Sequence, residues 1–248
     1  MQSLHTPTLI LPQPCISSME TLTFGIEELD RLFGGLKLGQ LVAFHGSWTS
    51  HILSELLCVR SQLPKNEGGL ESSVVFVDGG NIFNPYLISE NARLLGLAPE
   101  ETLQNIWISR AFTCYQLTAL ITEELPKILD REGPRLVVIS DIAHLYCDSD
   151  IGLWEAKRTF NRITLFLWNL VREKDIILLA TSLSTRHRRK WCLEQYLLGR
   201  ADVAAEVEDG NPHVKISLEK HPSKPSASVE LFLGEFTAQS LLEDFMEV

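Results

Sequence analysis

Short apolar runs bounded by turn residues recur along the chain and predict buried strands of a parallel sheet. They lie at residues 41–44, 74–78, 106–112, 136–139 and 176–180. Between these runs, apolar residues recur at helical spacing, most clearly over 153–174. Because strands alternate with helices, the pattern predicts an α/β domain with a mostly parallel central sheet.

The remaining pattern adds shorter elements around this sheet. Apolar residues at 26, 29, 32 and 33 predict a short amphipathic helix that Gly34 and Gly35 end. Further helices are expected from Ile52 onward and over 87–96 and 115–131. Alternating strands at 201–207, 213–219 and 228–233, joined by turns, predict an antiparallel edge at the C-terminal end of the sheet.

Residues 1–20 differ from the rest and are interpreted as an N-terminal tail or arm, with residues 21–248 as one core domain. Within the arm, the run 8–11 lies between Pro7 and Pro12 and is able to add as a strand to a sheet edge, its own or a partner's. A disordered leader is the alternative. The first nineteen residues have no Lys or Arg, which does not fit a secretory signal.

Composition and charge narrow the class of protein. The 248 residues are 45% hydrophobic, which is enough for a sizeable core. The net charge of -10 argues against uniform, nonspecific contact with nucleic acid. No apolar run approaches the ~18 residues of a membrane span, and the five cysteines show no C-x-x-C spacing. We therefore expect an intracellular, soluble protein of the cytoplasm or nucleoid, with free thiols, no metal site and no membrane contact.

The turn after the first strand has the position of a phosphate-binding loop but little of its chemistry. Such a loop reads G-x-x-x-x-G-K-[ST], in which Lys reaches the terminal phosphates and the hydroxyl holds magnesium. Gly46 matches the first glycine, whereas His51 stands for the second glycine, Ile52 for the lysine and Leu53 for the hydroxyl residue. We expect the side chains at 51–53 to fill the space of a phosphate.

A longer motif carries a family resemblance. The run T-F-G-I-x-E-L-D-x-L-x-G-G-L-x-x-G-Q-L, which begins at Thr23 and leads into the first strand, resembles the opening of the RecA, RadA and KaiC ATPase core. The resemblance spans about residues 21–233. It implies a RecA-like P-loop NTPase fold, although fold alone does not imply activity.

The same resemblance assigns the other catalytic positions. Gly80 stands where the family has the glutamate that activates water, and Ser140 stands where it has the aspartate that orders magnesium. Asp141 comes one residue late, so in a strand its side chain faces the opposite side unless a bulge re-aims it. Four positions therefore differ from the family's catalytic residues: Ile52, Leu53, Gly80 and Ser140. Together they predict a degenerate site with no ATP or magnesium cofactor. The alternative is a divergent active site in which Thr49, Ser50, His51 and Asp141 stand in.

A basic segment follows the strand at 176–180. Its residues are Arg186, Arg188, Arg189, Lys190 and Trp191. In RecA-type recombinases the loop after this strand faces DNA, so the segment is our candidate for phosphate contacts with base stacking. A solvated basic loop, or a salt-bridge partner for an acidic neighbouring subunit, is the alternative.

Together these features favour a non-catalytic paralogue of the RecA/RadA family. Its expected role is that of an accessory factor in homologous recombination or DNA repair, which binds a recombinase of that family or a related paralogue, single-stranded DNA, or both. Two alternatives stay open: a DNA-dependent ATPase of the RadA/RadB type with ATP and Mg as cofactors, and a KaiC-like regulatory scaffold.

Overall fold

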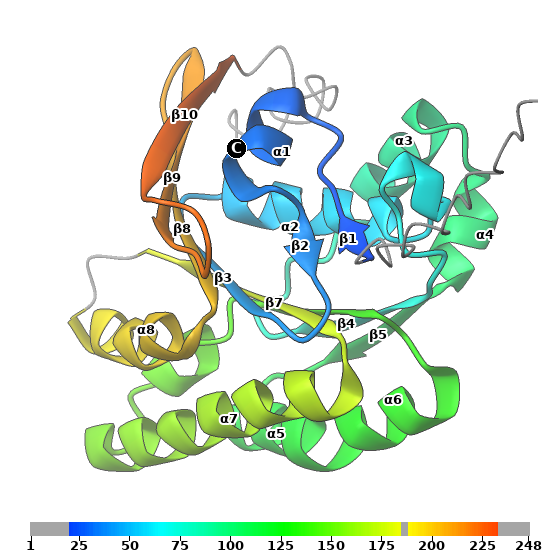
Figure 1. Ribbon diagram of the computed structural model, residues 1–248. Helices are drawn as coiled ribbons and strands as arrows, with labels where there is room; N and C mark the ends of the chain where they lie inside the picture. The colour runs from blue at the N-terminus through cyan, green and yellow to red at the C-terminus, as the bar shows by residue number, and fades with distance from the viewer. Residues whose placement is uncertain (1–19, 185–187, 233–248) are drawn as a thin grey trace, which may run out of the picture.

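An eight-stranded sheet in the order β10-β9-β8-β3-β7-β6-β4-β5 forms the centre of the molecule (Figure 1). The computed structural model describes residues 20–184 and 188–232. Six strands run parallel to one another: β3 (Leu41–Gly46), β4 (Val74–Asp78), β5 (Ile106–Arg110), β6 (Leu136–Ser140), β7 (Ile177–Leu183) and β8 (Val203–Asp209). The antiparallel strands β9 (His213–Lys220) and β10 (Ala227–Phe232) complete one edge.

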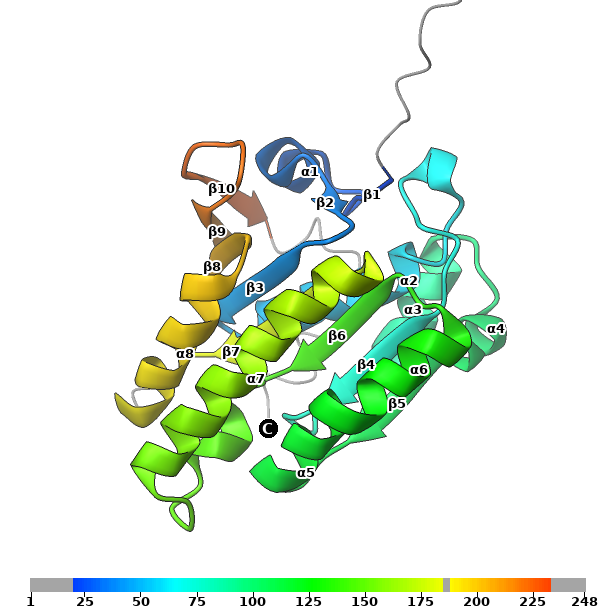
Figure 2. The ribbon, with the colours of Figure 1, turned by 60° about the horizontal axis from the view of Figure 1, so that its bottom comes forward.

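Helices cover both faces of the sheet (Figures 1 and 2). One layer holds α1 (Glu27–Phe33), α2 (Thr49–Arg60), α3 (Pro85–Leu94) and α4 (Pro99–Gln104). The other holds α5 (Cys114–Ala119), α6 (Leu125–Glu132), α7 (Leu153–Lys174) and α8 (Arg188–Arg200), with α5 and α6 joined by a π-helical turn at Leu120–Glu124. A small ribbon of β1 (Thr21–Leu22) and β2 (Leu36–Lys37) lies beside the main sheet.

The two-sided burial of the strands explains their apolar runs. In β4, Val74 and Phe76 pack in the core on one face, and Val75 and Val77 pack in the core on the other. Because side chains alternate along a strand, a strand covered on both faces needs apolar residues at every position. The expected α/β fold, with a mostly parallel sheet and an antiparallel C-terminal edge, is confirmed.

Element boundaries differ from expectation at functionally important places. Helix α7 has the predicted bounds, and the predicted strand over 106–112 ends at Arg110. Helix α2 begins at Thr49, three residues before the predicted start at Ile52. The segment from Arg188 was predicted as a loop, but it forms the first turn of α8. Its inward face, described below, is partly polar, which hides the helical periodicity.

The predicted arm at 1–20 lies outside the described residues except for Glu20. That carboxylate pairs with Lys65 and Arg135, so it ties the start of the described chain to the loops after α2 and α6. Among the helices of residues 20–184 and 188–232, we find none that is both long and apolar enough to cross a membrane.

Candidate functional site

The carboxyl ends of β3, β7, β6 and β4 lie side by side, at the edge where open parallel sheets hold their ligands. The turn that follows β3 contains only Ser47 and Trp48 before α2 begins. A phosphate-binding loop needs several more residues to wrap a phosphate. Of the predicted site residues, His51 and Asp141 are brought together here, because both contact the hydroxyl of Thr181 in β7.

The short turn uses its own backbone donors. Gly46 has φ 114°, and a β-carbon at this position would lie 2.1 Å from the carbonyl oxygen of Val207. The N–H of Ser47 donates to that same oxygen at 2.8 Å, and the N–H groups of Ser50 and His51 donate to the carbonyls of Ser47 and Trp48. Three N–H groups around the turn are therefore already paired within the chain and are not presented to an anion.

His51 is held as a neutral, buried imidazole. Its Nδ1 lies within hydrogen-bond distance, 2.8 Å, of Oγ1 of Thr181, and that oxygen also accepts from the N–H of Asp141 at 3.0 Å. Burial lowers the pKa of His51 to about 4. Its Nε2, like Ser47 Oγ and Thr49 Oγ1, has no hydrogen-bond partner among the described residues. The hydroxyl of Ser50 donates to the carbonyl of Ser47 at 2.8 Å.

Asp141 is turned into the site, contrary to the direction that a strand position would give it. The strand β6 ends at Ser140, and Asp141 adopts φ 39°, which re-aims its side chain. The carboxylate accepts the N–H of Leu183 at 3.1 Å and forms an ion pair of 2.7 Å with the ammonium of Lys190. Both side chains of this pair are only 4% exposed. A lysine of α8 thus neutralises the carboxylate that the divergent-ATPase alternative would use.

The neighbouring carboxylate of Asp78 is also fully engaged. It accepts the hydroxyl of Ser140 at 2.8 Å and the N–H groups of Ile82 and Phe83, and it pairs with the guanidinium of Arg110 at 2.8 Å. Gly80 lies so close to Asp141 that a β-carbon would approach the aspartate Cβ to 2.9 Å. A glutamate at this position would therefore need the Asp141 turn to move.

These residues do not fit a Mg·ATP complex. Ile52 has no charge to offer a phosphate. Leu53 was expected to fill the space of a phosphate, but it packs in the core on the face of the sheet that α2 covers. Of the two carboxylates at the strand ends, one is paired with Lys190 and the other with Arg110. We therefore derive no catalytic step through a nucleotide or a metal ion.

Helix α8 places some of the predicted DNA-binding residues on the surface and buries another. Arg186 lies outside the described residues. Arg188 and Trp191 are exposed, the latter by 58% of its surface, and Arg189 donates to the carbonyl of Ile151 at 2.8 Å. The assignment of Lys190 to this surface is wrong, because its ammonium is buried against Asp141.

Sequence reasoning missed the polar partners that close the site. The buried face of α8 carries Lys190, Leu193, Glu194 and Leu197, and Glu194 accepts the hydroxyl of Ser182 at 2.8 Å. Burial raises the pKa of the Glu194 carboxyl. The spacing of these four positions is that of one helix face, and this was the signal available in the sequence.

Comparison with known proteins agrees with this architecture. The family model for Rad51 matches residues 16–185, more than half of the chain. The chain belongs to the Rad51 family. One curated relative of this Rad51-family chain is the DNA repair protein RAD51 homolog B of Zea mays, with 29% identity over 157 residues. The match covers 62% of this chain and 46% of that protein, so the chain spans about half the length of this relative.

Proposed function

We propose that this chain is a non-catalytic Rad51-family paralogue, an accessory factor in homologous recombination or DNA repair. The proposal rests mainly on one observation: the ammonium of Lys190 neutralises Asp141 inside the protein. Asp141 is the carboxylate one residue after Ser140, the position at which the family resemblance places the magnesium-binding aspartate. The relative from Zea mays is named as a DNA repair protein, which supports the same pathway. Such a role places the chain inside the cell, in contact with a recombinase of its family or a related paralogue.

The closed turn supports the lack of nucleotide chemistry. A general base contributes roughly 10²- to 10⁴-fold to a rate, and Gly80 offers none. A hydrogen bond to a charged group contributes on the order of 1.5 to 3 kcal/mol, and Ile52 offers none to a phosphate. The backbone N–H groups of Ser47, Ser50 and His51 are paired internally, so these three donors do not replace the lost contacts.

Calorimetric titration with Mg·ATP, with and without single-stranded DNA, tests the lack of a nucleotide site. We expect no saturable heat at high micromolar nucleotide, whereas a Rad51-family ATPase with the complete G-x-x-x-x-G-K-[ST] loop gives a binding isotherm in the same cell. Saturable binding that disappears in Asp141→Asn and Thr49→Ala would instead establish the divergent-ATPase alternative.

We further propose that single-stranded DNA, where it binds, contacts the exposed start of α8. Arg188 supplies a fixed charge and Trp191 an exposed indole, the combination that binds phosphates and stacks bases. In fluorescence anisotropy with labelled oligothymidine, we expect Arg188→Ala and Trp191→Ala each to weaken binding several-fold. The matched control is Lys215→Ala on β9, which should change little. Equal affinities for all three variants would exclude this surface.

A further inference from the structure

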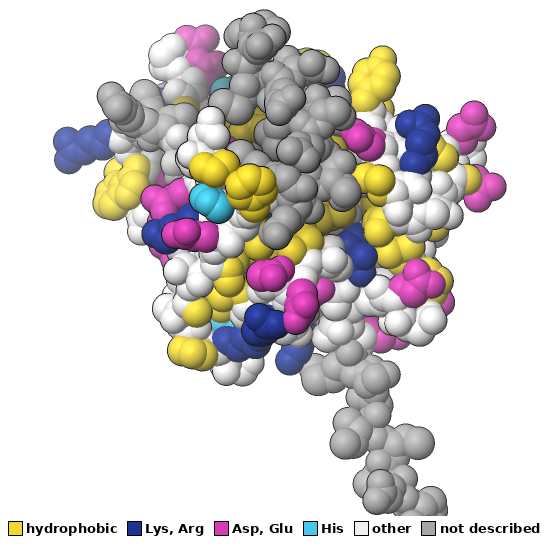
Figure 3. Space-filling view, turned by 90° about the horizontal axis from the view of Figure 1, so that it is seen from above, with side chains coloured by type: hydrophobic (Ala, Val, Ile, Leu, Met, Phe, Trp, Pro, Cys, Tyr) yellow, Lys and Arg dark blue, Asp and Glu magenta, His cyan; other side chains and the backbone are white. Residues whose placement is uncertain are grey.

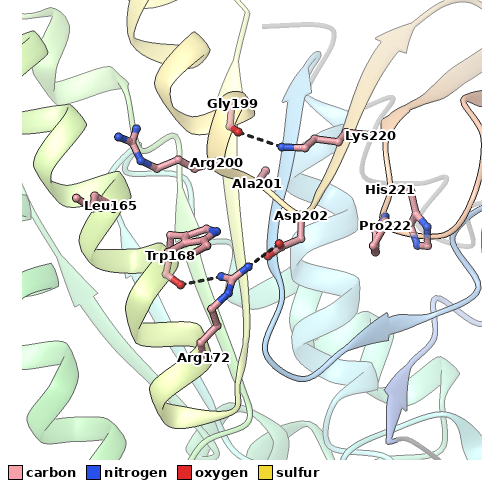
Figure 4. A pocket seen from close by; sticks show the side chains of 10 residues that line it. All are labelled: Leu165, Trp168, Arg172, Gly199, Arg200, Ala201, Asp202, Lys220, His221 and Pro222. Carbon is pink, nitrogen blue, oxygen red and sulfur yellow. Dashed lines mark hydrogen bonds and ion pairs between the residues drawn. The ribbon is translucent and has the colours of Figure 1, made fainter.

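A hollow of about 510 Å³ is lined by residues of α7, α8 and β9 and by those before β8 (Figure 4). It lies at the amino ends of β3 and β8, whereas the closed nucleotide site lies at the carboxyl ends of the parallel strands. Its walls are the C-terminal half of α7, the last turn of α8 with the residues before β8, and the end of β9. Asp202 at its base accepts the N–H of Leu41, which fixes it to the start of β3. No residue of the nucleotide site lines this hollow, so a ligand here is independent of nucleotide binding.

One wall of the hollow is apolar and accessible. Leu165 and Trp168 lie three residues apart on α7, so they share a helix face, and Leu165 is 46% exposed. Ala201 and Pro222 line the other walls. The guanidinium of Arg172 stacks over the Trp168 ring at 3.9 Å from its centroid, which fixes the indole in place. The wall is therefore preformed for one aliphatic or aromatic side chain.

The charges around the hollow are not balanced. Arg172 pairs with Asp202 at 2.7 Å, and this carboxylate is the single acidic group in the lining. The ammonium of Lys220 bonds to the neutral carbonyl of Gly199 at 3.0 Å. Burial lowers the pKa of His221, which disfavours the charged form of its ring.

Arg200 adds a second cation that is held only by uncharged groups. Its guanidinium donates to Asn161 Oδ1, Thr164 Oγ1 and the carbonyl of Tyr196. In the described residues, neither Arg200 nor Lys220 has an acidic partner. Two uncompensated cations beside an apolar wall stand out in a chain of net charge -10.

We propose that this hollow binds an acidic segment of a partner protein. One apolar side chain of the segment packs against Leu165 and Trp168, and a neighbouring carboxylate pairs with Lys220. Nucleic acid fits less well, because Arg172 already covers one face of the Trp168 ring, on which a base would stack. Charge complementarity at the rim and an apolar anchor at the centre are how such segments are recognised.

A peptide array tests the chemistry of the ligand. Each peptide carries one Leu or Phe flanked at varied spacing by glutamates, and a matched set carries glutamine in place of every glutamate. We expect the purified full chain to bind the acidic set above the neutral set, and to lose binding when the apolar residue becomes serine. An array on which the two sets bind alike would overturn the proposal.

Variants then locate the contact, with the strongest peptide labelled for anisotropy at low salt. Lys220→Glu should weaken binding about fivefold or more, because it replaces an attraction with a repulsion. Leu165→Ser should weaken it about threefold or more through lost apolar contact. Lys215→Glu, on the same strand but outside the hollow, should change it less than twofold. Equal affinities for all variants would contradict the assignment, as would a Lys220→Glu variant that loses oligothymidine binding and keeps peptide binding.

Discussion

At the residue scale, the pair of Lys190 and Asp141 is the most consequential interaction of the candidate site. Removing one partner of a buried ion pair leaves an uncompensated charge and costs about 3 to 5 kcal/mol. We therefore expect Lys190→Met, which keeps the unbranched side chain but is one atom shorter and uncharged, to lower the free energy of unfolding by that amount. Urea unfolding followed by circular dichroism measures it.

The double variant Lys190→Met with Asp141→Asn is the control for this prediction. It removes both charges, so its loss of stability should be clearly smaller than that of Lys190→Met alone. Additive losses from the two single variants would show that the ammonium and the carboxylate do not interact in solution. The nucleotide site would then lack the internal cation that our functional proposal assumes.

Glu55 makes a separate prediction about pH. This carboxyl on α2 is buried, and burial raises its pKa from 4.5 to about 8, with the nearby Asp78 charge adding to the shift against the hydrogen bond from Asn84. Between pH 4.5 and about 8, Glu55 is therefore protonated in the folded state and ionised in the unfolded chain. Stability from this group is therefore full below pH 4.5 and is lost as the pH rises toward 8, by up to about 1.4 kcal/mol per unit.

His51 acts in the opposite direction and in a different window. Its pKa is lowered to about 4 by burial, so the unfolded chain binds the extra proton between pH 6.5 and 4 and stability falls as the solution is acidified. Between pH 6.5 and 8 only Glu55 of these two titrates. In that window we expect Glu55→Gln to flatten the decline in the free energy of unfolding that the parent chain shows. Parallel curves for the two proteins would mean that the carboxyl is ionised when folded.

At the element scale, the turn between β3 and α2 is too short and too tightly packed to form a phosphate-binding loop. Gly46→Ala places a methyl group against the Val207 carbonyl, at a positive φ that side chains rarely adopt. We expect a loss of about 3 kcal/mol or more in the free energy of unfolding. Gly199→Ala is the matched control, since its β-carbon meets open space within α8 and should stabilise the helix by up to about 1 kcal/mol. Equal effects of the two variants would contradict the tight turn.

The elements differ in how well the sequence predicts them. The bounds of α7 follow from a regular apolar stripe, and β4 follows from an unbroken apolar run. Helix α8 was not predicted, because two of its four buried positions, Lys190 and Glu194, are ionisable residues. A search for apolar residues at helical spacing does not find a buried face that is half polar. The helical spacing of the four positions is present in the sequence, but that the two charged side chains are buried follows only from their partners, Asp141 and Ser182.

The same limit applied to the candidate site. The sequence alone shows that Ile52 and Gly80 differ from the catalytic residues of the family, because the motif fixes which residue type belongs at each position. The direction of Asp141 depends on a single left-handed residue at the end of β6, and local pattern does not reveal it. The neutralisation of that carboxylate depends on a contact with Lys190, 49 residues away. The observed site therefore differs from the predicted one mainly through contacts between residues far apart in the sequence, such as that of Lys190 with Asp141.

At the scale of the whole molecule, charge sets a bound on any DNA contact. The chain carries a net charge of -10, and on the face seen in Figure 3 Lys and Arg side chains are interspersed with Asp and Glu. With Lys190 buried, the basic segment offers at most Arg186, Arg188 and Arg189 to phosphates. Each phosphate contact with a single strand adds roughly 0.7 to the slope of log affinity against log salt, so the slope should not exceed about 2 in magnitude.

Anisotropy titrations with oligothymidine between about 50 and 200 mM salt measure this slope. We expect Arg188→Ala to reduce its magnitude by about 0.7. The control Trp191→Phe should lower affinity without changing the slope, since stacking releases no counterions. A slope steeper than about 3 requires more cations than the start of α8 provides. It would show that another surface of this Rad51-family chain makes the main contact with DNA.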